Sequence, residues 1–303
     1  MSKIAFLFSG QGSQYPGMGK ELFESSNAAR RVFEMADGIR HGTSLQCFTA
    51  SKDELSTTVN TQPCLFCVDL AAAEALSEAN IRPDFIAGFS LGEIPALAFG
   101  GYLSYDGAFR FVCKRAEYMD AAAQKNKGAM VAVLKLSEEK VEEIAENVGC
   151  CYPVNYNCNG QTVVACAEEK ADALIQAVKQ SGGRGLRLAV SGAFHSPYMS
   201  QAKAQLQKTF SYLQLKSPKI PVYSNVTAQI YTGIELLFDQ VSSPVLWKKT
   251  IEEMCAQGVD TFIEVGAGKT LSNLVSKIVS DAVVLNVEDE RSLVKTLEVL
   301  KNK

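Results

Sequence analysis

The stretch that decides the fold is DFIAGFSLGEIPALAFGG, residues 84–101. It joins a short apolar run to a second, helix-forming run through the motif Gly-x-Ser-x-Gly at Gly88–Gly92. Small residues are needed there because a turn from strand to helix is tight and strained. Such a turn exposes the serine hydroxyl at the mouth of a sheet, facing a backbone N–H and a helix N-terminus. The stretch therefore predicts a nucleophile elbow with Ser90 as the nucleophile; the alternative is a glycine-rich turn without chemistry.

The segments on either side of the elbow alternate between strand and helix patterns. Residues 4–8 (IAFLF) predict a buried strand that runs into a glycine-rich loop, and residues 105–125 predict a helix. Further strands are predicted at 221–226 (PVYSNV) and 261–266 (TFIEVG). This alternation indicates an α/β layer structure with a mostly parallel sheet.

The pattern changes after residue 127. Strand and helix signals follow in the order βαββαβ over residues 128–190, with an Asn-Gly hairpin signal at 159–160. This order is the ferredoxin-like split unit. We therefore predict a large α/β domain made of residues 1–126 and 191–303, with an inserted ferredoxin-like domain at 127–190.

The composition excludes several classes of protein. A net charge of −3 and an acidic isoelectric point argue against a nucleic-acid binder, and no apolar run approaches the roughly 20 residues that span a bilayer. The chain starts without a signal-peptide pattern. Its nine cysteines, an odd number, predict buried thiols in a cytoplasmic protein, and we assign the pair Cys64 and Cys67, a CxxC, to core packing.

A serine nucleophile needs a base, and the chain offers two histidines. His41 lies in a polar, glycine-containing segment that predicts a surface loop. His195 follows a predicted strand and is flanked by small residues and Pro197. His195 is therefore the better candidate for a general base, although a lone histidine is more often structural than catalytic.

Neither the acid of a triad nor the role of the arginine follows from the residues alone. Asp106, Asp120 and Asp172 lie between serine and histidine, but each is in a helix-like stretch without the strand end that a triad acid needs. Arg115 in FRFVCKRAEYMD is either a solvated helix arginine or a guanidinium fork for a carboxylate.

Seven motifs together resemble bacterial malonyl-CoA:acyl carrier protein transacylases, and also the acyltransferase domains of polyketide synthases. The resemblance covers essentially the whole chain and implies a hydrolase-like α/β domain with a ferredoxin-like insert. The motifs occur in the order GQGSQYPGMG, GFSLGE, the Arg115 segment, GAFHSPYM, NVTA, PVLW and EVGAGKTL.

The resemblance implies a role for several residues. Ser90 would be the nucleophile and His195 the base, while the backbone N–H groups of Gln11 and Leu91 would form the oxyanion hole. Arg115 would bind the malonyl carboxylate.

The resemblance also implies that a main-chain carbonyl, rather than an acid, orients the histidine. The matching position is Leu246 in PVLW, and Asn157 matches an active-site asparagine. Three residues depart from the family pattern: Phe89 replaces the usual histidine before the nucleophile, Pro95 lies in the elbow helix and Ala267 replaces a proline.

The expected reaction is transfer of malonyl from malonyl-CoA to the phosphopantetheine thiol of an acyl carrier protein, by a monomer. No metal or redox cofactor is expected, since CoA and phosphopantetheine belong to the substrates. Two alternatives remain: a hydrolase on the same scaffold that strips acyl groups from carriers, and a non-catalytic subunit that docks a carrier protein.

Overall fold

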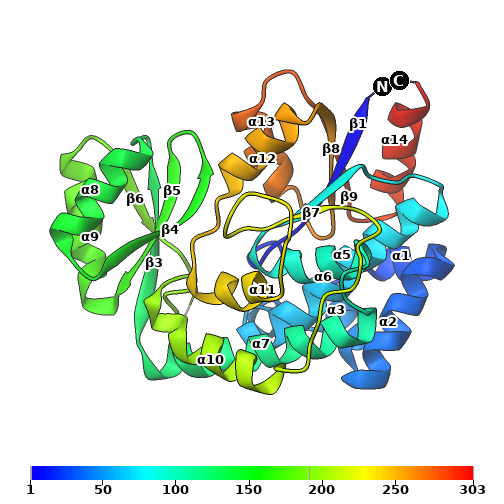
Figure 1. Cartoon of the computed structure of the whole chain (residues 1–303), viewed down its shortest axis with the longest axis horizontal. Coiled ribbons are helices and arrows are strands. Elements are labelled where there is room, and N and C mark those ends of the chain that lie inside the picture. Colours follow the sequence, from blue (N-terminus) through cyan, green and yellow to red (C-terminus); the bar gives the residue numbers. More distant parts are fainter. Residues whose placement is uncertain (1, 191, 303) are drawn as a thin grey trace.

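A computed structural model describes residues 2–190 and 192–302 and contains two sheets, each with its own helices (Figure 1). The larger sheet has the order β7-β2-β1-β8-β9, and all its neighbouring strands run parallel. Its strands are β1 (Lys3–Phe8), β2 (Phe85–Gly88), β7 (Val222–Tyr223), β8 (Val259–Val265) and β9 (Val283–Val287).

Helices cover both faces of the parallel sheet. In β1, Phe6 and Phe8 join the large core that includes α5 (Thr58–Glu78) and α6 (Glu93–Phe99). The alternate residues Ala5 and Leu7 join a second core, on the side of α12 (Trp247–Ala256) and α13 (Thr270–Ile278). A strand buried on both faces is apolar throughout, which explains the unbroken run IAFLF.

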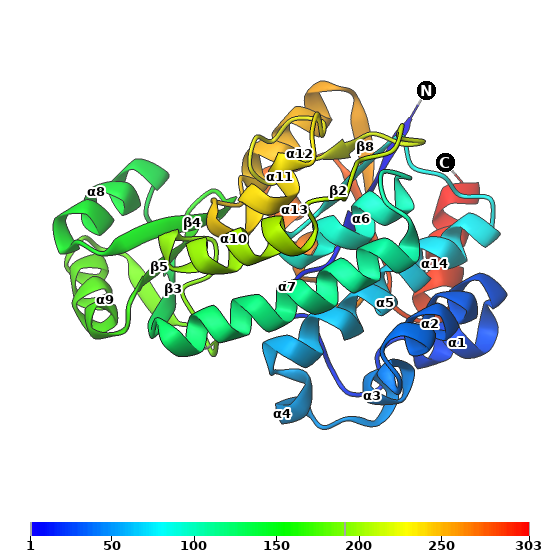
Figure 2. The ribbon, with the colours of Figure 1, turned by 60° about the horizontal axis from the view of Figure 1, so that its bottom comes forward.

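The long helix α7 (Tyr105–Lys125) spans the predicted range and connects the two sheets (Figure 2). The Ser104 side chain caps its first turn by accepting a hydrogen bond from the backbone N–H of Gly107. Three residues after its end the chain enters the smaller sheet. The other helices are α1 (Lys20–Ser25), α2 (Asn27–Ile39), α3 (Thr43–Thr49), α4 (Lys52–Leu55), α10 (Ser200–Thr209), α11 (Glu235–Asp239) and α14 (Glu290–Lys301).

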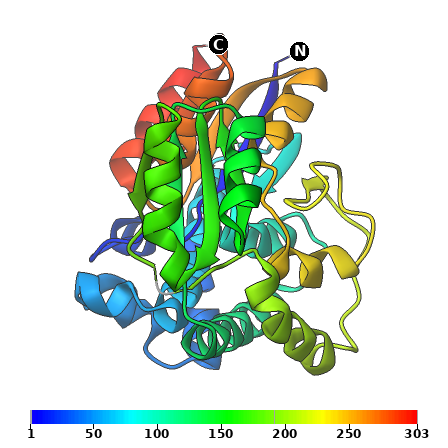
Figure 3. The same cartoon turned by 90° about the vertical axis from the view of Figure 1, so that its left-hand side faces the viewer.

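The smaller sheet is antiparallel, with the order β4-β5-β3-β6, and two helices pack on one of its faces (Figure 3). The predicted βαββαβ unit and the α/β fold class are confirmed. The turn at 159–160 joins β4 to β5, and Gly160 has a φ of 69°. The elements are β3 (Gly128–Leu134), α8 (Glu138–Val148), β4 (Cys151–Cys158), β5 (Gln161–Ala167), α9 (Ala171–Gln180) and β6 (Arg184–Arg187).

The two faces of the small sheet serve different purposes. In β3, Ala129, Val131 and Val133 pack in the core under α8 and α9. Met130 and Ala132 point the other way and join the core of the large domain. Because side chains alternate along a strand, the second face is turned toward the large sheet and can line a cavity between them.

Some boundaries differ from the sequence predictions. The last strand of the βαββαβ unit, which was predicted to extend to residue 190, ends at Arg187, and the strand predicted at 221–226 has only two residues. Strand β9 was not predicted. The domain limits remain a prediction. Residues 1, 191 and 303, at which segments of the predicted large domain begin or end, lie outside the described residues.

Two expectations from composition can be compared with the structure. Cys64 and Cys67 are fully buried, as core residues would be. Within residues 2–190 and 192–302, no helix is long and apolar enough to cross a membrane.

Candidate active site

The elbow motif forms the predicted tight connection from β2 to α6. Ser90 has a φ of 53°, a left-handed conformation that is unfavourable for any residue with a Cβ. A Cβ on Gly88 would lie 2.0 Å from the carbonyl carbon of Gly92, and one on Gly92 would lie 2.3 Å from the carbonyl oxygen of Phe8. Both glycines are therefore required by the close approach of backbone segments at the turn.

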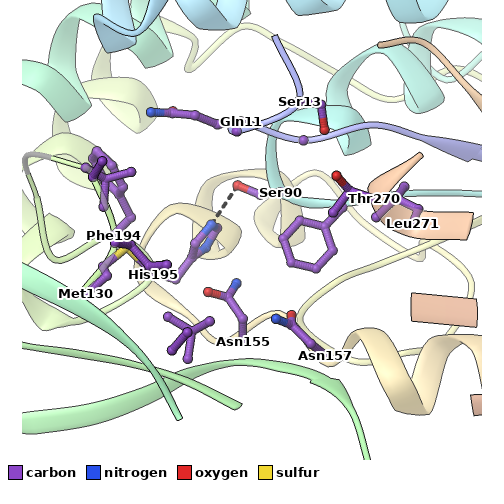
Figure 4. A pocket seen from close by; sticks show the side chains of 18 of the residues that line it. Gln11, Ser13, Ser90, Met130, Asn155, Asn157, Phe194, His195, Thr270 and Leu271 are labelled. Atoms are coloured by element: carbon purple, nitrogen blue, oxygen red, sulfur yellow. Dashed lines mark hydrogen bonds between the residues drawn. The ribbon is translucent and has the colours of Figure 1, made fainter. Parts of the chain in front are cut away.

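The fold brings Ser90 and His195 together across 105 positions of sequence. The Ser90 Oγ lies 2.6 Å from the His195 Nε2, which is hydrogen-bonding distance (Figure 4). His195 is 4% exposed and, like Ser90, has a left-handed backbone, with a φ of 61°. His41, in contrast, is exposed at the surface.

The other ring nitrogen of His195 fixes the tautomer. Its Nδ1 lies 2.8 Å from the carbonyl oxygen of Gln240. A carbonyl can only accept, so Nδ1 carries the proton and Nε2 is left as the acceptor for the Ser90 hydroxyl. This is the arrangement that a general base requires.

The expectation that Leu246 orients the histidine is wrong. Its carbonyl accepts hydrogen bonds from the backbone N–H and the Oγ1 of Thr250, both at 2.9 Å, because Leu246 caps the start of α12. A main-chain carbonyl does orient His195, but it is that of Gln240. Among the described residues, the hydrogen bonds of His195 involve no aspartate.

Burial and charge hold His195 in its neutral form. Removal from solvent lowers the pKa of His195 to about 4, and the nearby Arg115 guanidinium contributes to the shift. Both effects disfavour an added positive charge on the ring. The imidazole is therefore available as a base at neutral pH.

Arg115 lies beside the serine and is 1% exposed, so the alternative of a solvated helix arginine is wrong. Its Nη1 donates to the Oε1 of Gln62 at 2.7 Å, and its Nη2 reaches the Ser90 Oγ at 3.3 Å. Burial lowers the pKa of Arg115 to about 10, while the negative charge of Glu93 opposes the shift. The side chain therefore stays cationic, and its buried Nε has no partner among the described residues.

Gln240 was not predicted as a site residue, yet this fully buried residue contacts all three central groups. Besides the bond from its carbonyl to His195, its Oε1 accepts from the Arg115 Nη2 at 2.8 Å. Its Nε2 donates to the backbone carbonyl of Ser90 at 2.6 Å. No motif marks it, because its segment, ELLFDQVSSP, carries no pattern that distinguishes this glutamine from a surface one.

A cavity of about 430 Å³ opens at these groups and is lined from both sheets. The loop after β1 contributes Gln11, while β4 contributes Asn155 and Asn157 (Figure 4). Asn157 is 6% exposed, and its Oδ1 has no hydrogen-bond partner among the described residues. An unpaired buried acceptor in a cavity wall is a candidate ligand-binding group.

Phe89, the departure from the family pattern, also lines the cavity. Its ring packs edge-on against Trp247, with the centroids 5.3 Å apart. This contact replaces any polar role of the position by apolar packing. Pro95 lies three residues into the elbow helix α6, and Ala267 is fully buried.

No cluster of three or more His, Cys, Asp or Glu residues that could hold a metal ion occurs in the described part of the chain. The cavity instead combines a serine, a neutral histidine and a buried cation. A nucleophile and its base next to a guanidinium suit acyl transfer from a substrate that carries a carboxylate.

Comparison with known proteins agrees with this chemistry. Residues 5–296 match the family model of the acyl transferase domain. The chain is 39% identical over 311 residues to the malonyl CoA-acyl carrier protein transacylase of Bacillus subtilis, covering 99% of this chain and 98% of that protein. The chain belongs to the malonyl CoA-acyl carrier protein transacylase family.

Solved structures of the transacylase family share the whole fold. The transacylase of Clostridium perfringens superposes with a TM-score of 0.96 at 36% identity, over 99% of this chain and 98% of that one. A malonyl-transacylase solved in complex with its type II PKS acyl-carrier protein superposes with a TM-score of 0.94 at 31% identity, over 98% of this chain and 100% of that one.

Proposed function

We propose that this chain transfers a malonyl group from malonyl-CoA to the phosphopantetheine thiol of an acyl carrier protein, through an ester on Ser90. The observation that carries the proposal is the position of Arg115, whose Nη2 lies 3.3 Å from the Ser90 Oγ. In a malonyl thioester a single methylene separates the carboxylate from the thioester carbonyl. A carboxylate bound at Arg115 therefore brings that carbonyl to the nucleophile.

The first half-reaction forms the ester. His195 takes the proton of the Ser90 hydroxyl through Nε2 while Oγ attacks the thioester carbonyl. The carbonyl oxygen becomes an oxyanion, for which we propose the backbone N–H groups of Leu91 and Gln11 as donors. The C–S bond then breaks, and His195 returns the proton to the leaving CoA thiolate.

The second half-reaction repeats these steps in reverse with a new thiol. The phosphopantetheine thiol of the carrier gives its proton to His195 and attacks the malonyl ester, and Ser90 leaves with that proton. Because a thioester is exchanged for an ester and back, the reaction is nearly balanced and the enzyme supplies mainly positioning and oxyanion stabilisation. Asn157 would contribute its free Oδ1 to the bound substrate.

A carrier protein as acceptor is supported by the related malonyl-transacylase solved with its acyl-carrier protein. The two alternatives, a carrier thioester hydrolase and a non-catalytic docking subunit, are less well supported. The buried cation suits a retained carboxylate, and the intact Ser90–His195 pair suits catalysis. We further propose that the enzyme acts as a monomer. We also propose that it is located in the cytoplasm, where its cysteines remain thiols.

Intact mass spectrometry tests the proposal. Incubation with malonyl-CoA should add one malonyl group to the peptide that contains Ser90. Holo-carrier protein added afterwards should remove this group from the enzyme, and the mass of the carrier should increase by one malonyl group. Ser90→Ala should abolish labelling, because loss of a serine nucleophile lowers the rate about 10⁶-fold. Stoichiometric labelling of Ser90→Ala would overturn the assignment, and release of free malonate in place of malonyl-carrier would favour the hydrolase.

A further inference from the structure

A fully buried side chain outside the cavity lining bonds to the elbow backbone at two positions. The Asn225 Nδ2 donates to the backbone carbonyl of Gly88 at 2.6 Å, and its Oδ1 accepts from the backbone N–H of Ser90 at 2.7 Å. Asn225 is fully buried and is not among the described residues that line the cavity. One amide thus contacts the backbone both before and at the nucleophile.

These two bonds restrain the backbone at Ser90, whose conformation is strained. Ser90 has a φ of 53°, which a serine adopts only when its surroundings impose it. The direction of the Ser90 Cα–Cβ bond, and hence of its hydroxyl toward His195, follows from that backbone conformation. The bond also occupies the Ser90 N–H, which is consistent with the N–H of Leu91 as the proposed oxyanion donor on this segment.

Asn225 is itself held by a second set of buried groups. Its backbone N–H donates to the Oε2 of Glu93 at 2.6 Å, and its carbonyl accepts from the N–H of Leu246 at 2.9 Å. The hydroxyl of Tyr231 donates to the other oxygen of Glu93. Glu93 is the first residue of α6, three positions after Ser90, so the network closes on the elbow helix itself.

We propose that Asn225, fixed by Glu93 and Tyr231, is a positioning residue that holds Ser90 in its reactive conformation. The inference rests on the proposed function, because it takes malonyl-CoA as the substrate. The hydrogen-bond geometry behind it does not depend on that function. Arg115 is held by Gln62 and Gln240, and among the described residues neither of these side chains is hydrogen-bonded to Asn225. Loss of Asn225 should therefore slow attack by Ser90 without weakening the grip on the malonyl carboxylate.

The test measures single-turnover acylation by malonyl-CoA with rapid quenching, over a range of concentrations. For Asn225→Ala we expect the acylation rate constant to fall about 100-fold, as for a nucleophile misplaced by about 1 Å, while the half-saturating concentration changes less than about twofold. Asn225→Asp, which retains an acceptor for the Ser90 N–H, should recover part of the rate. Tyr231→Phe, which deletes one oxygen, should lower the rate about 3- to 10-fold.

Tyr105→Phe is the matched control. The Tyr105 hydroxyl also donates to a glutamate, Glu74, but outside the elbow network. Tyr105→Phe should therefore reduce the melting temperature, as Tyr231→Phe does, but leave the acylation rate unchanged. If Asn225→Ala does not fold, the comparison of the two tyrosine variants decides the question.

Several outcomes would overturn the inference. They are a wild-type acylation rate in Asn225→Ala or in Tyr231→Phe, a half-saturating concentration that rises as much as the rate falls, or an equal loss of rate in Tyr105→Phe. A neutral fluorophosphonate, which reacts with an activated serine without needing Arg115, separates the inference from the proposed function. Slower modification of the Asn225 and Tyr231 variants by this probe supports the inference even if the wild-type chain does not accept malonyl-CoA.

Discussion

The two sheets of this chain contribute different kinds of groups to one cavity. The parallel sheet presents Gln11 and Ser90 at the carboxyl ends of β1 and β2, the edge at which open α/β sheets bind ligands. The antiparallel sheet contributes apolar side chains and three amides, Asn155, Asn157 and Gln161, without a charge.

The difference has a physical origin. The parallel sheet is buried on both faces, so its chemistry lies at strand ends, where the backbone is strained and charged groups from neighbouring helices converge. The small sheet packs α8 and α9 on one face and turns the other to the cavity, so it supplies shape and hydrogen bonds from strand interiors. Changes in the large domain should therefore affect rates and charge selectivity, and changes in the small sheet should affect substrate affinity.

The strongest test of this division is Arg115→Ala. Loss of a charged hydrogen-bond partner costs about 1.5 to 3 kcal/mol, so kcat/KM for malonyl-CoA should fall roughly 10- to 150-fold. Transfer from acetyl-CoA should stay level or rise, because acetyl has no carboxylate to bind. Arg115→Lys should recover only part of the activity, since a point charge cannot reproduce the planar fork.

Steady-state kinetics with both thioesters measure these values. Lys114→Ala is a suitable control, because Lys114 is the neighbouring cation on α7 but pairs with Glu117 at the surface. An equal fall for malonyl-CoA and acetyl-CoA in Arg115→Ala would mean that Arg115 supports the fold or binds the CoA moiety, and the malonyl assignment would lose its main support.

A smaller effect is expected from the opposite wall of the cavity, in Asn157→Ala. The Oδ1 of Asn157, which is unpaired among the described residues, offers one neutral hydrogen bond, worth about 0.5 to 1.5 kcal/mol. KM for malonyl-CoA should therefore rise about 2- to 10-fold, while kcat stays constant. Thr162→Val is the matched control: Thr162 is also buried in the small sheet with its Oγ1 unpaired in the described structure, but it does not line the cavity.

Kinetics of the two variants would sharpen or break the comparison between the sheets. A rise in KM for Asn157→Ala alone would assign substrate binding to β4. A fall in kcat with an unchanged KM would instead give the small sheet a part in the chemistry.

The division also explains which features the sequence could predict. Side-chain patterns predicted the elbow at Ser90, the helix over 105–125 and the βαββαβ insert, because each depends on residue types at fixed spacing. Strand β9, VVLNV, escaped prediction because it is five residues long and lies at the sheet edge, with four of them half-buried.

The orientation of His195 could not be assigned from side chains. Every residue has a main-chain carbonyl, so nothing in the sequence distinguishes Gln240 from Leu246 as the acceptor. The resemblance suggested the kind of group but misplaced it by six positions, and Leu246 instead caps α12. The buried environment of Arg115 was likewise invisible, because it depends on contacts with residues 53 and 125 positions away.

The pH dependence of acylation tests the electrostatics of the large domain, and the expected change is small. The pKa of His195 is lowered to about 4, and a base acts in its unprotonated form, which is present above that value. Single-turnover acylation by malonyl-CoA should thus vary less than about twofold between pH 5.5 and 8. A histidine with an ordinary pKa of about 6.5 would lose about tenfold at pH 5.5, and such a loss would contradict the buried, neutral His195.

One other buried group near the elbow titrates in this range. Burial raises the pKa of Glu93 to about 7, against the hydrogen bonds from Tyr231 and Asn225 that favour its ionised form. Glu93→Gln is therefore the control variant. A step near pH 7 that disappears in this variant belongs to Glu93, whereas a step that remains belongs to another group.

The smallest effects are expected from Asp106→Asn, Asp120→Asn and Asp172→Asn. Replacing the aspartate of a serine protease triad by asparagine lowers kcat about 10⁴-fold, because the histidine then adopts the wrong tautomer. Here the Gln240 carbonyl fixes the tautomer, and Asp106 and Asp172 are exposed in the first turns of α7 and α9. The two first-turn variants should lose only about 0.3 to 1 kcal/mol of stability through the helix dipole, and all three should transfer malonyl within about twofold of wild type. Melting temperatures measured beside kcat separate the two effects, and a 10⁴-fold loss of kcat in a folded variant would mean that an acid, and not a main-chain carbonyl, orients His195.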